Sequence, residues 1–329
     1  MRAMMHTVFP AWVLLAALLL DAAIGDPYAL YRAVPHPVAL IGRAIAALDA
    51  AWNRPERSRR ARRLLGVLLL ATMVLGMLAI GGLIVALAAR IPYGWLIEAL
   101  AVYVLIAQRS LYLHVRAVAR ALETDGLAAG RAAVGMIVGR DPETLDEAGV
   151  CRAAVESCAE SFADGVVSPI FWYVVLGLPG MLAFKAVNTL DSMVGHKSEK
   201  YVDFGWASAR FDDLMNFVPA RIAGWLLVAA AGIARFADGH RAGWVMMRDA
   251  RVHHSPNAGW PESAVAGALG LKLLGPRIYP GEVVDAPWIG EGTADATPAH
   301  IRQSLLLYAA ACVFDGLGAV AVLAWVWGL

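Results

Sequence analysis

Cysteine is scarce in this chain, and neither sign of charge is in excess. Only 3 of the 329 residues are cysteines. Cys151 and Cys158 stand seven positions apart in a helical pattern, which is about 10.5 Å along a helix axis and too far for a disulfide. The 28 Lys and Arg nearly balance the 27 Asp and Glu, so the chain lacks the basic field that attracts nucleic acid. We therefore expect reduced cysteines and no nucleic-acid partner.

Short catalytic signatures are also missing. The sequence contains no nucleophile elbow of the G-x-S-x-G type. Gly195-His196-Lys197-Ser198 looks like part of a phosphate loop but lacks the G-x-x-x-x-G-K-[ST] spacing. His253-His254 has no partner at metal-ligand spacing. These absences argue against a Walker-type nucleotide site and against a histidine metal site.

Hydrophobic residues, by contrast, make up 59% of the chain, and residues 64–89 carry no charge at all. A helix needs about 20 apolar residues to cross a bilayer, so this run predicts a membrane span and a lipid bilayer as partner. Further spans are expected near 7–25, 91–107 and 305–329. The first run is short enough that a signal peptide is an alternative to an anchor.

Two other apolar runs are interrupted. Residues 165–187 contain Pro169, Pro179 and several glycines, and the apolar part of 222–236 is short. Such runs favour broken or re-entrant helices beside a polar cavity. If both cross, the polar stretch between them faces outward; we prefer the alternative, in which neither crosses fully. The predicted fold class is an all-α, polytopic membrane protein with cytoplasmic amphipathic helices and loops, forming one domain over residues 1–329.

The orientation follows from residues 53–63, which hold six Arg and one Glu. The positive-inside bias places this segment in the cytoplasm, and contact with lipid phosphates would give the same side. Three polar segments are then expected to carry the chemistry on the cytoplasmic face of the inner membrane: 108–164, 188–221 and 237–300. Residues 275–296 are rich in Gly and Pro and favour a small hairpin.

Residues 144–162 predict an amphipathic helix, with Thr144 and Glu147 as a capping box at its start. Like charges at four-residue spacing share one face of a helix and repel one another. Three carboxylates have this spacing: Glu156, Glu160 and Asp164. Such an acidic stripe indicates either a site for a divalent or organic cation, or a solvated helix surface.

Residues 185–221 hold a second set of charges. Lys185, Asn188 and Asp191 are three residues apart in turn and therefore share one helical face. Asp212 and Asp213 follow in a further helical segment. The arginines at 210 and 221 could clamp a phosphate or pair with these aspartates, and Lys197 has the pattern of a surface lysine.

Residues 253–262 read HHSPNAGWPE, and their prolines and glycine predict a rigid turn. We expect Asn257, Trp260 and Glu262 to project from it. A rigid turn that presents an amide, an indole and an acid suits ligand binding, although a plain turn before a helix at 262–274 is equally consistent.

The sequences of these segments resemble those of the adenosylcobinamide-phosphate synthases, a membrane family of cobalamin biosynthesis. The likeness covers nearly the whole chain, and only residues 198–202 and 282–297 depart from it. The matching pieces are Gly25-Asp26-Pro27, Pro35-His36-Pro37-Val38, Ile41-Gly42, Val138-Gly139-Arg140-Asp141, Leu145-Asp146-Glu147-Ala148-Gly149, Ala154-Val155-Glu156-Ser157, Asp164-Gly165-Val166-Val167-Ser168-Pro169, Lys185-Ala186-Val187-Asn188-Thr189-Leu190-Asp191-Ser192-Met193, Asp203-Phe204-Gly205-Trp206-Ala207-Ser208-Ala209-Arg210 and Ser255-Pro256-Asn257-Ala258-Gly259-Trp260-Pro261-Glu262.

The resemblance implies an ATP-dependent amide ligase that joins adenosylcobyric acid to (R)-1-amino-2-propanol O-phosphate; the residues do not distinguish this ester from the free amino alcohol. ATP is then a co-substrate and Mg²⁺ a cofactor, since phosphoryl transfer depends on metal and cationic groups. From charge and spacing we assign Mg²⁺ to Glu156, Glu160 and Asp164. The catalytic candidates are Lys185, Asp191, Asp212 and Asp213. The substrate-binding candidates are His36, Arg140, Arg152, Asn188, Lys197, Arg210, Arg221, Asn257, Trp260 and Glu262.

Two other functions remain open at this stage. A membrane accessory or signalling protein of similar shape would have lost the charged central block, which is present here. A corrinoid transporter is consistent with broken helices and with acids inside membrane segments. The sequence also allows oligomerisation.

Overall fold

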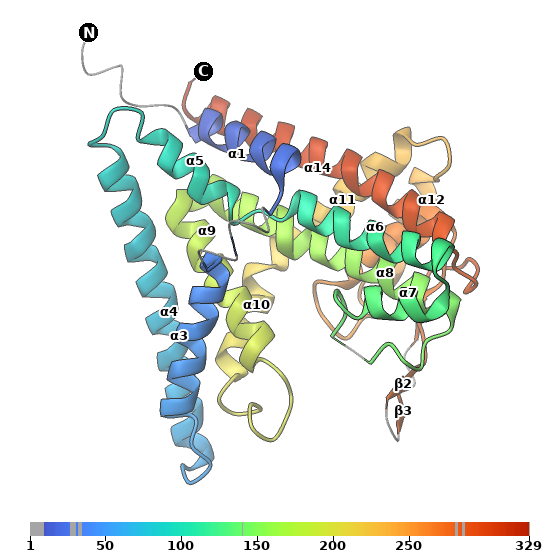
Figure 1. Cartoon of the computed structure of the whole chain (residues 1–329), viewed down its shortest axis with the longest axis horizontal. Helices are drawn as coiled ribbons and strands as arrows, with labels where there is room; N and C mark the ends of the chain where they lie inside the picture. Colours follow the sequence, from blue (N-terminus) through green and yellow to red (C-terminus); the bar gives the residue numbers. More distant parts are fainter. Residues whose placement is uncertain are drawn as a thin grey trace. The chain divides into compact units, whose positions relative to one another are not determined.

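The computed structural model describes residues 10–26, 31, 35–139, 141–279, 282–284 and 287–328. The described chain is almost entirely helical, which confirms the predicted all-α class. It divides into two compact units (Figure 1). Unit 1 comprises Met1–Ala107, Ser168–Asn216 and Gly316–Leu329, and unit 2 comprises Gln108–Val167 and Phe217–Asp315.

Unit 1 is built around a hairpin of two helices that lie side by side in Figure 1, α3 and α4. Its helices are α1 (Pro10–Ile24), α3 (Pro37–Trp52), α4 (Arg59–Ala88), α5 (Trp95–Tyr103), α9 (Ser168–Val194) and α10 (Trp206–Met215). α9 packs against α3, α4 and α10, and α1 packs against α5. A core of Ile45, Leu69, Leu190 and Phe204, all fully buried, joins α3, α4, α9 and the loop before α10.

Unit 2 packs α13 against α8, α11 and α12, and α6 against α7 and α8. Its helices are α6 (Gln108–Thr124), α7 (Leu127–Val134), α8 (Glu147–Phe162), the π-helix η2 (Ala163–Val167), α11 (Phe217–Ile233), α12 (Gly239–Asp249) and α13 (Gly259–Leu269). The last helix, α14 (Pro298–Val326), contributes residues to both units. It begins at Pro298, a residue type favoured in the first turn of a helix.

The predicted hairpin near 275–296 is confirmed. β2 (Arg277–Tyr279) pairs antiparallel with β3 (Glu282–Val284), and Figure 1 shows this pair projecting from the helices of its unit. β1 (Leu273–Leu274) pairs antiparallel with β4 (Trp288–Ile289) at its base.

Among the described residues, four helices are long and apolar enough to cross a membrane, or five if the bent pair α10–α11 counts as one span. The predicted spans near 64–89 and 305–329 correspond to α4 and α14. The span near 91–107 begins at Trp95 and continues through α6 to Thr124. Large side chains such as Leu64, Leu75 and Leu83 of α4 are 57–70% exposed, as expected of a surface that faces lipid. The first predicted span appears as the shorter apolar helix α1.

The predicted break at 165–187 is present. Gly177 adopts φ +66°, a left-handed conformation that suits glycine, and Pro179 follows it, so α9 is kinked at this point. The second predicted break is displaced: most of 222–236 lies within the continuous helix α11, and the chain bends by 44° before this range, between α10 and α11.

The start of the acidic helix differs from the prediction. α8 begins at Glu147, and the Asp146 carboxylate caps it by accepting the Gly149 amide at 2.7 Å; Thr144 lies outside the helix. Most of α8 is buried, so it is not the solvated amphipathic helix that was the alternative. Its turns continue through η2 into α9, up to Val194.

An acid inside an apolar helix needs a partner, and the structure supplies one for Glu98. The Tyr173 hydroxyl of α9 donates a hydrogen bond to Glu98 Oε1 over 3.1 Å. This bond joins α5 and α9 within unit 1 and satisfies a carboxyl group that is costly at membrane depth.

Candidate functional site

The first polar centre lies in unit 1, where α9 faces α10. It brings together Asn188, Asp191, Asp212 and Asp213, and we call these four residues the aspartate centre. Asn188 Nδ2 donates to Asp212 Oδ1 over 3.5 Å, while Asp191 interacts electrostatically with both Asp212 and Asp213. Asn188 and Asp191 thus share one face of α9, as predicted. The helix that packs there, α10, carries two further carboxylates.

Asp212 is the buried member of the aspartate centre, with 8% of the residue exposed. Its other carboxylate oxygen accepts from Asn216 Nδ2 at 2.9 Å, and Ser168 Oγ donates to Asn216 Oδ1 at 2.6 Å. A hydrogen-bonded chain therefore runs from Ser168 through Asn216 and Asp212 to Asn188. Asp212 is well suited to hold the two amides in place. Ser168 and Asn216 also belong to this centre, and no pattern in the sequence predicts a role for them there.

Asp213 is the more accessible aspartate, and cations surround it. Arg210 Nη1 lies 3.7 Å from Asp213 Oδ2, with the Arg210 side chain 70% exposed. Lys197 also interacts electrostatically with Asp213. Lys197 is exposed, as predicted for a surface lysine, and Arg210 adopts the pairing with an aspartate that the sequence left open.

His36 and Lys185 lie near one another in unit 1. His36 is the N-cap of α3, and its Nδ1 accepts the Val38 amide over 3.2 Å. Burial and the positive charge of Lys185 lower the pKa of His36 despite an opposing effect of Asp26. His36 was predicted as a substrate-binding residue, and its imidazole also has the structural role of capping α3.

The second polar centre is a cavity of about 250 Å³ in unit 2. It lies between α8, α13 and the turn before α13, and carboxyl and imidazole groups line it. Its lining residues are Ile137, Val138, Gly139, Ala153, Glu156, Ser157, Glu160, His253, His254 and Glu262. The sequence indicated Glu156 and Glu160 as one set and Glu262 as part of another; the fold brings all three to one cavity together with the two histidines.

Backbone contacts fix the walls of this cavity. Glu156 Oε1 accepts the Leu274 amide at 2.9 Å, and Ser157 Oγ donates to the Ile137 carbonyl at 2.7 Å. His253 Nδ1 accepts the Ser255 amide at 3.0 Å, which leaves Nε2 directed at Glu262 Oε1, 3.8 Å away. The imidazole orientation is therefore set by the turn itself.

The predicted Mg²⁺ centre is not formed as a set of three ligands. In the described part of the chain, no three His, Cys, Asp or Glu side chains converge at metal-ligand spacing. Glu156 and Glu160 line the cavity, whereas Asp164 lies in the π-helix η2 and is not one of its lining residues. A π-helix does not keep the rotation per residue of the α-helix, on which the predicted four-residue repeat depended.

The turn at 253–262 does not present all the side chains expected of it. Asn257, Trp260 and Glu262 are 6%, 9% and 2% exposed, so the prediction that they project is wrong. Asn257 Oδ1 accepts from Arg221 Nη1 at 3.2 Å, and the Arg221 guanidinium lies 4.6 Å from the Trp260 ring. Two of the substrate-binding candidates, Asn257 and Trp260, thus hold a third, Arg221, within unit 2.

The two remaining arginine candidates differ in what can be said of them. Arg152 donates to the Ala294 carbonyl and lies over the Trp288 ring, 5.6 Å from its centroid. It therefore joins α8 to β4 and to the segment that follows β4. Arg140 lies outside the described residues.

Asp249, at the end of α12, anchors the segment after β4. Its carboxylate receives two hydrogen bonds from Arg248, at 2.5 and 2.7 Å, and one from the Gly290 amide at 2.8 Å. Burial raises the pKa of the Asp249 carboxyl, but these hydrogen bonds outweigh it and hold the pKa below its ordinary value of 3.8. Arg248 also pairs with Glu291.

This arrangement predicts an acid-sensitive unit 2. A carboxyl group whose pKa is lowered by folding stabilises the folded state above its ordinary pKa, and the contribution is lost as the pH falls through the folded-state pKa. Asp249→Asn should lower the thermal midpoint in detergent at pH 6 by an amount that corresponds to about 1–2 kcal/mol. The deficit relative to wild type should shrink as the pH is lowered below 4. A difference that stays constant with pH would contradict the assignment.

The fold and these two centres define a class: a multi-pass helical membrane protein that holds clustered carboxylates, amides and cations in its polar segments. The family model for CobD/Cbib proteins matches residues 14–308, and the chain belongs to this family. The match spans the described members of both centres. Membership assigns the chain to cobalamin biosynthesis as a biosynthetic enzyme.

Several relatives share this similarity, each named cobalamin biosynthesis protein CobD. The protein from Sinorhizobium sp is 52% identical over 304 residues, covering 91% of this chain and 94% of the relative. That from Rhodobacter capsulatus is 48% identical over 318 residues, covering 95% and 98%. That from Brucella anthropi is 47% identical over 302 residues, covering 90% and 91%. No solved structure matches the chain.

Proposed function

We propose that this protein is an ATP-dependent ligase that joins adenosylcobyric acid to (R)-1-amino-2-propanol O-phosphate. The observation that carries the proposal is membership of the CobD/Cbib family over residues 14–308. The clustered cations and carboxylates of unit 1 support it, because an acid, an amine and a phosphoryl donor all need charged partners.

The chemistry of amide formation explains the use of ATP. A carboxylate cannot expel oxide when an amine attacks it. Transfer of the terminal phosphoryl group of ATP to the carboxylate gives an acyl phosphate and ADP. The amine then attacks the acyl carbon, the bond to the phosphate oxygen breaks, and the amide and inorganic phosphate are released. The ammonium must lose its proton before the attack, so the reaction needs a base.

The residues of unit 1 suit these steps. Lys185, Lys197 and Arg210 supply the positive charge with which a protein holds phosphate oxygens. Asp191 and Asp213 are the candidates for accepting the ammonium proton. Asp212 is already bound by two amides, and we assign it the role of fixing Asn188 and Asn216.

The place of Mg²⁺ in this proposal is narrower than the sequence prediction. The ion binds one or two protein carboxylates together with substrate phosphates, and it neutralises charge on the transferring phosphoryl group. The three predicted ligands do not converge, so we derive no step through them. We propose that Mg²⁺ arrives bound to the phosphates of ATP.

We place the reaction on the cytoplasmic face of the inner membrane. The arginine-rich segment 53–63, which includes the start of α4, supports this side through the positive-inside bias. ATP is also a cytoplasmic substrate. A cysteine introduced at Ser198 should therefore resist an impermeant thiol reagent in intact cells and react after lysis.

The direct test uses the full-length protein purified in detergent. It receives adenosylcobyric acid, ATP, Mg²⁺ and either aminopropanol phosphate or the free amino alcohol, and mass spectrometry detects the condensed corrinoid. We expect product with the phosphate ester and none when ATP is omitted. Absence of product from folded protein and intact substrates would refute the ligase. Uptake of corrinoid by sealed vesicles without amide formation would instead support a transporter.

A further inference from the structure

The loop at residues 195–205, between α9 and α10, closes on itself. A methyl group placed on Gly205 would lie 1.6 Å from the Val194 carbonyl oxygen and 3.2 Å from the Gly195 nitrogen. The Gly205 amide also donates to the Tyr201 carbonyl at 2.7 Å. The two ends of this 195–205 loop are therefore in contact, as in compact loops that often carry function.

The base of the loop, where residues 195 and 205 meet, lies against the aspartate centre. The Gly195 amide donates to the Asp191 carbonyl at 2.8 Å, and a methyl group on Gly195 would lie 2.0 Å from Asp191 Oδ1. The next two residues, His196 and Lys197, interact electrostatically with Asp191 and Asp213 respectively. The position of the loop base therefore decides which positive charges lie beside the aspartate centre.

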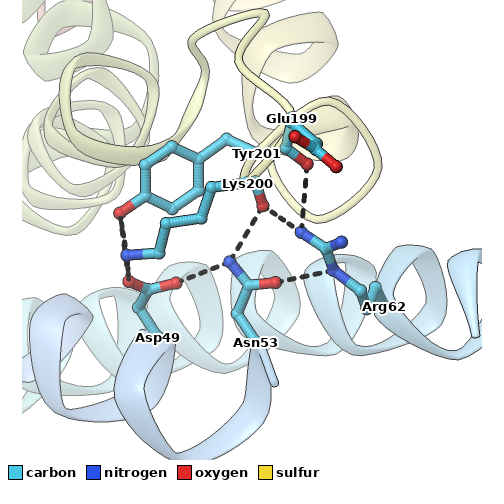
Figure 2. A network of polar contacts seen from close by, with 6 residues as sticks. All are labelled: Asp49, Asn53, Arg62, Glu199, Lys200 and Tyr201. Atoms are coloured by element: carbon cyan, nitrogen blue, oxygen red, sulfur yellow. Dashed lines mark hydrogen bonds and ion pairs between the residues drawn. The ribbon is translucent and has the colours of Figure 1, made fainter. Parts of the chain in front are cut away.

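The tip of the loop, at Lys200 and Tyr201, is bound to α3 (Figure 2). Lys200 Nζ lies 2.9 Å from Asp49 Oδ2, and the Tyr201 hydroxyl donates to the same oxygen over 3.1 Å. Lys200 Nζ also donates to the Tyr201 oxygen at 2.6 Å, so the three groups form a closed triangle. These hydrogen bonds raise the pKa of Lys200, which keeps its ammonium charged.

The main chain of the loop is held as well as its side chains. Asn53 Nδ2 donates to Asp49 Oδ1 at 2.9 Å and to the Lys200 carbonyl at 3.2 Å. Arg62 of α4 donates to Asn53 Oδ1 at 2.9 Å and to the carbonyls of Lys200 and Glu199, as Figure 2 shows.

Two more arginines of the 53–63 segment and the start of α4 reach the same region. Arg59 lies 2.9 Å from Asp203, and the Arg63 guanidinium lies 3.9 Å from the Trp206 ring. The arginine-rich segment that predicts membrane orientation therefore also binds the loop.

We infer that Asp49 is a positioning residue for substrate binding: by holding Lys200 and Tyr201 at the tip of the 195–205 loop, it fixes His196 and Lys197 beside Asp191 and Asp213 at the base of the loop. The ligand served is the phosphate group of an anionic substrate. The inference rests on the proposed ligase function for its kinetic consequences. Its physical basis is preorganisation, since charges held in place before binding cost no ordering when the substrate arrives.

The test compares Asp49→Asn with Glu199→Gln in the full-length protein. Both remove one carboxylate, but Glu199 contributes only its main-chain carbonyl to the contacts described above. Loss of a charged hydrogen bond corresponds to about a tenfold or larger increase in loop opening, measured by amide hydrogen exchange over 195–205. We expect the KM for the phosphate-bearing substrates to rise about tenfold, with kcat changed less than about twofold. Asp49→Glu should restore both, and Glu199→Gln should resemble wild type.

Binding of inorganic pyrophosphate can be measured without turnover. The readout is its protection of the amides of residues 195–197 from hydrogen exchange. If wild type makes no product but pyrophosphate protects these amides, and protects them less in Asp49→Asn, the inference stands and the ligase proposal fails. If wild type makes product and Asp49→Asn opens the loop without changing KM, the ligase stands and the inference is refuted.

Discussion

Gly66→Ala should strongly destabilise unit 1. A methyl group at this position would lie 1.9 Å from the Phe204 carbonyl oxygen and 2.8 Å from its carbonyl carbon. Because Phe204 belongs to the buried core and its backbone cannot rotate away, α4 and the 195–205 loop must separate. Overpacking of this kind costs about 1–3 kcal/mol, so the thermal midpoint in detergent should fall by several degrees.

The same helix provides a matched control. Gly76 also lies in α4, and among the described residues no atom outside its own helical turns lies within 4 Å of the place its methyl group would take. Gly76→Ala should leave the midpoint unchanged or raise it, because alanine is favoured over glycine in a helix by about 0.5–1 kcal/mol. Equal thermal midpoints of the two variants would show that the Phe204 carbonyl does not lie this close to α4.

Asp212→Ala should have the second large effect. The substitution removes the hydrogen-bond acceptor of both Asn188 and Asn216. The Asn216 amide is buried and the Asn188 amide is half-buried. A buried donor that loses its partner costs about 1–3 kcal/mol, so we expect a total near 2–4 kcal/mol. Turnover in the ligase assay should fall as well, because Asn188 would no longer be held beside Asp191. Chemical denaturation monitored by tryptophan fluorescence measures the first effect.

Two variants control this experiment. Asp212→Asn keeps one carbonyl oxygen as an acceptor and should be less damaging than alanine. Asp213→Ala removes a carboxylate one position away whose pairing with Arg210 is largely exposed, so it should cost only about 0–1 kcal/mol of stability. If Asp213→Ala destabilises the protein as much as Asp212→Ala, the hydrogen-bonded chain through Asp212 does not carry the stability assigned to it.

The aspartate centre shows what a local pattern can and cannot predict. The spacing of Asn188 and Asp191 places them on one helical face, because the period of a helix is fixed by its backbone. The pattern says nothing about which helix packs on that face. Ser168 and Asn216 are 48 positions apart and were therefore not recognised as partners.

The cavity of unit 2 also shows that a local sequence pattern does not predict contacts made by helix packing. His253 and His254 have no ligand-spaced neighbours in sequence, yet they lie beside Glu156 and Glu160 because α13 packs on α8. Conversely, Asp164 follows the four-residue repeat perfectly on paper but falls in a π turn, which changes the rotation per residue. A rule based on helical period fails wherever the helix itself departs from that period.

The sequence by itself determined the helical class, the main spans and the kink near Gly177, because each depends on the composition of a short stretch and on the cost of placing charge in lipid. Tertiary structure alone decided that Lys200, 151 positions from Asp49, binds it, and that arginines expected only to orient the chain also hold a loop. Such pairings depend on how helices pack against one another, and packing is set by the summed shape of many side chains rather than by any local period.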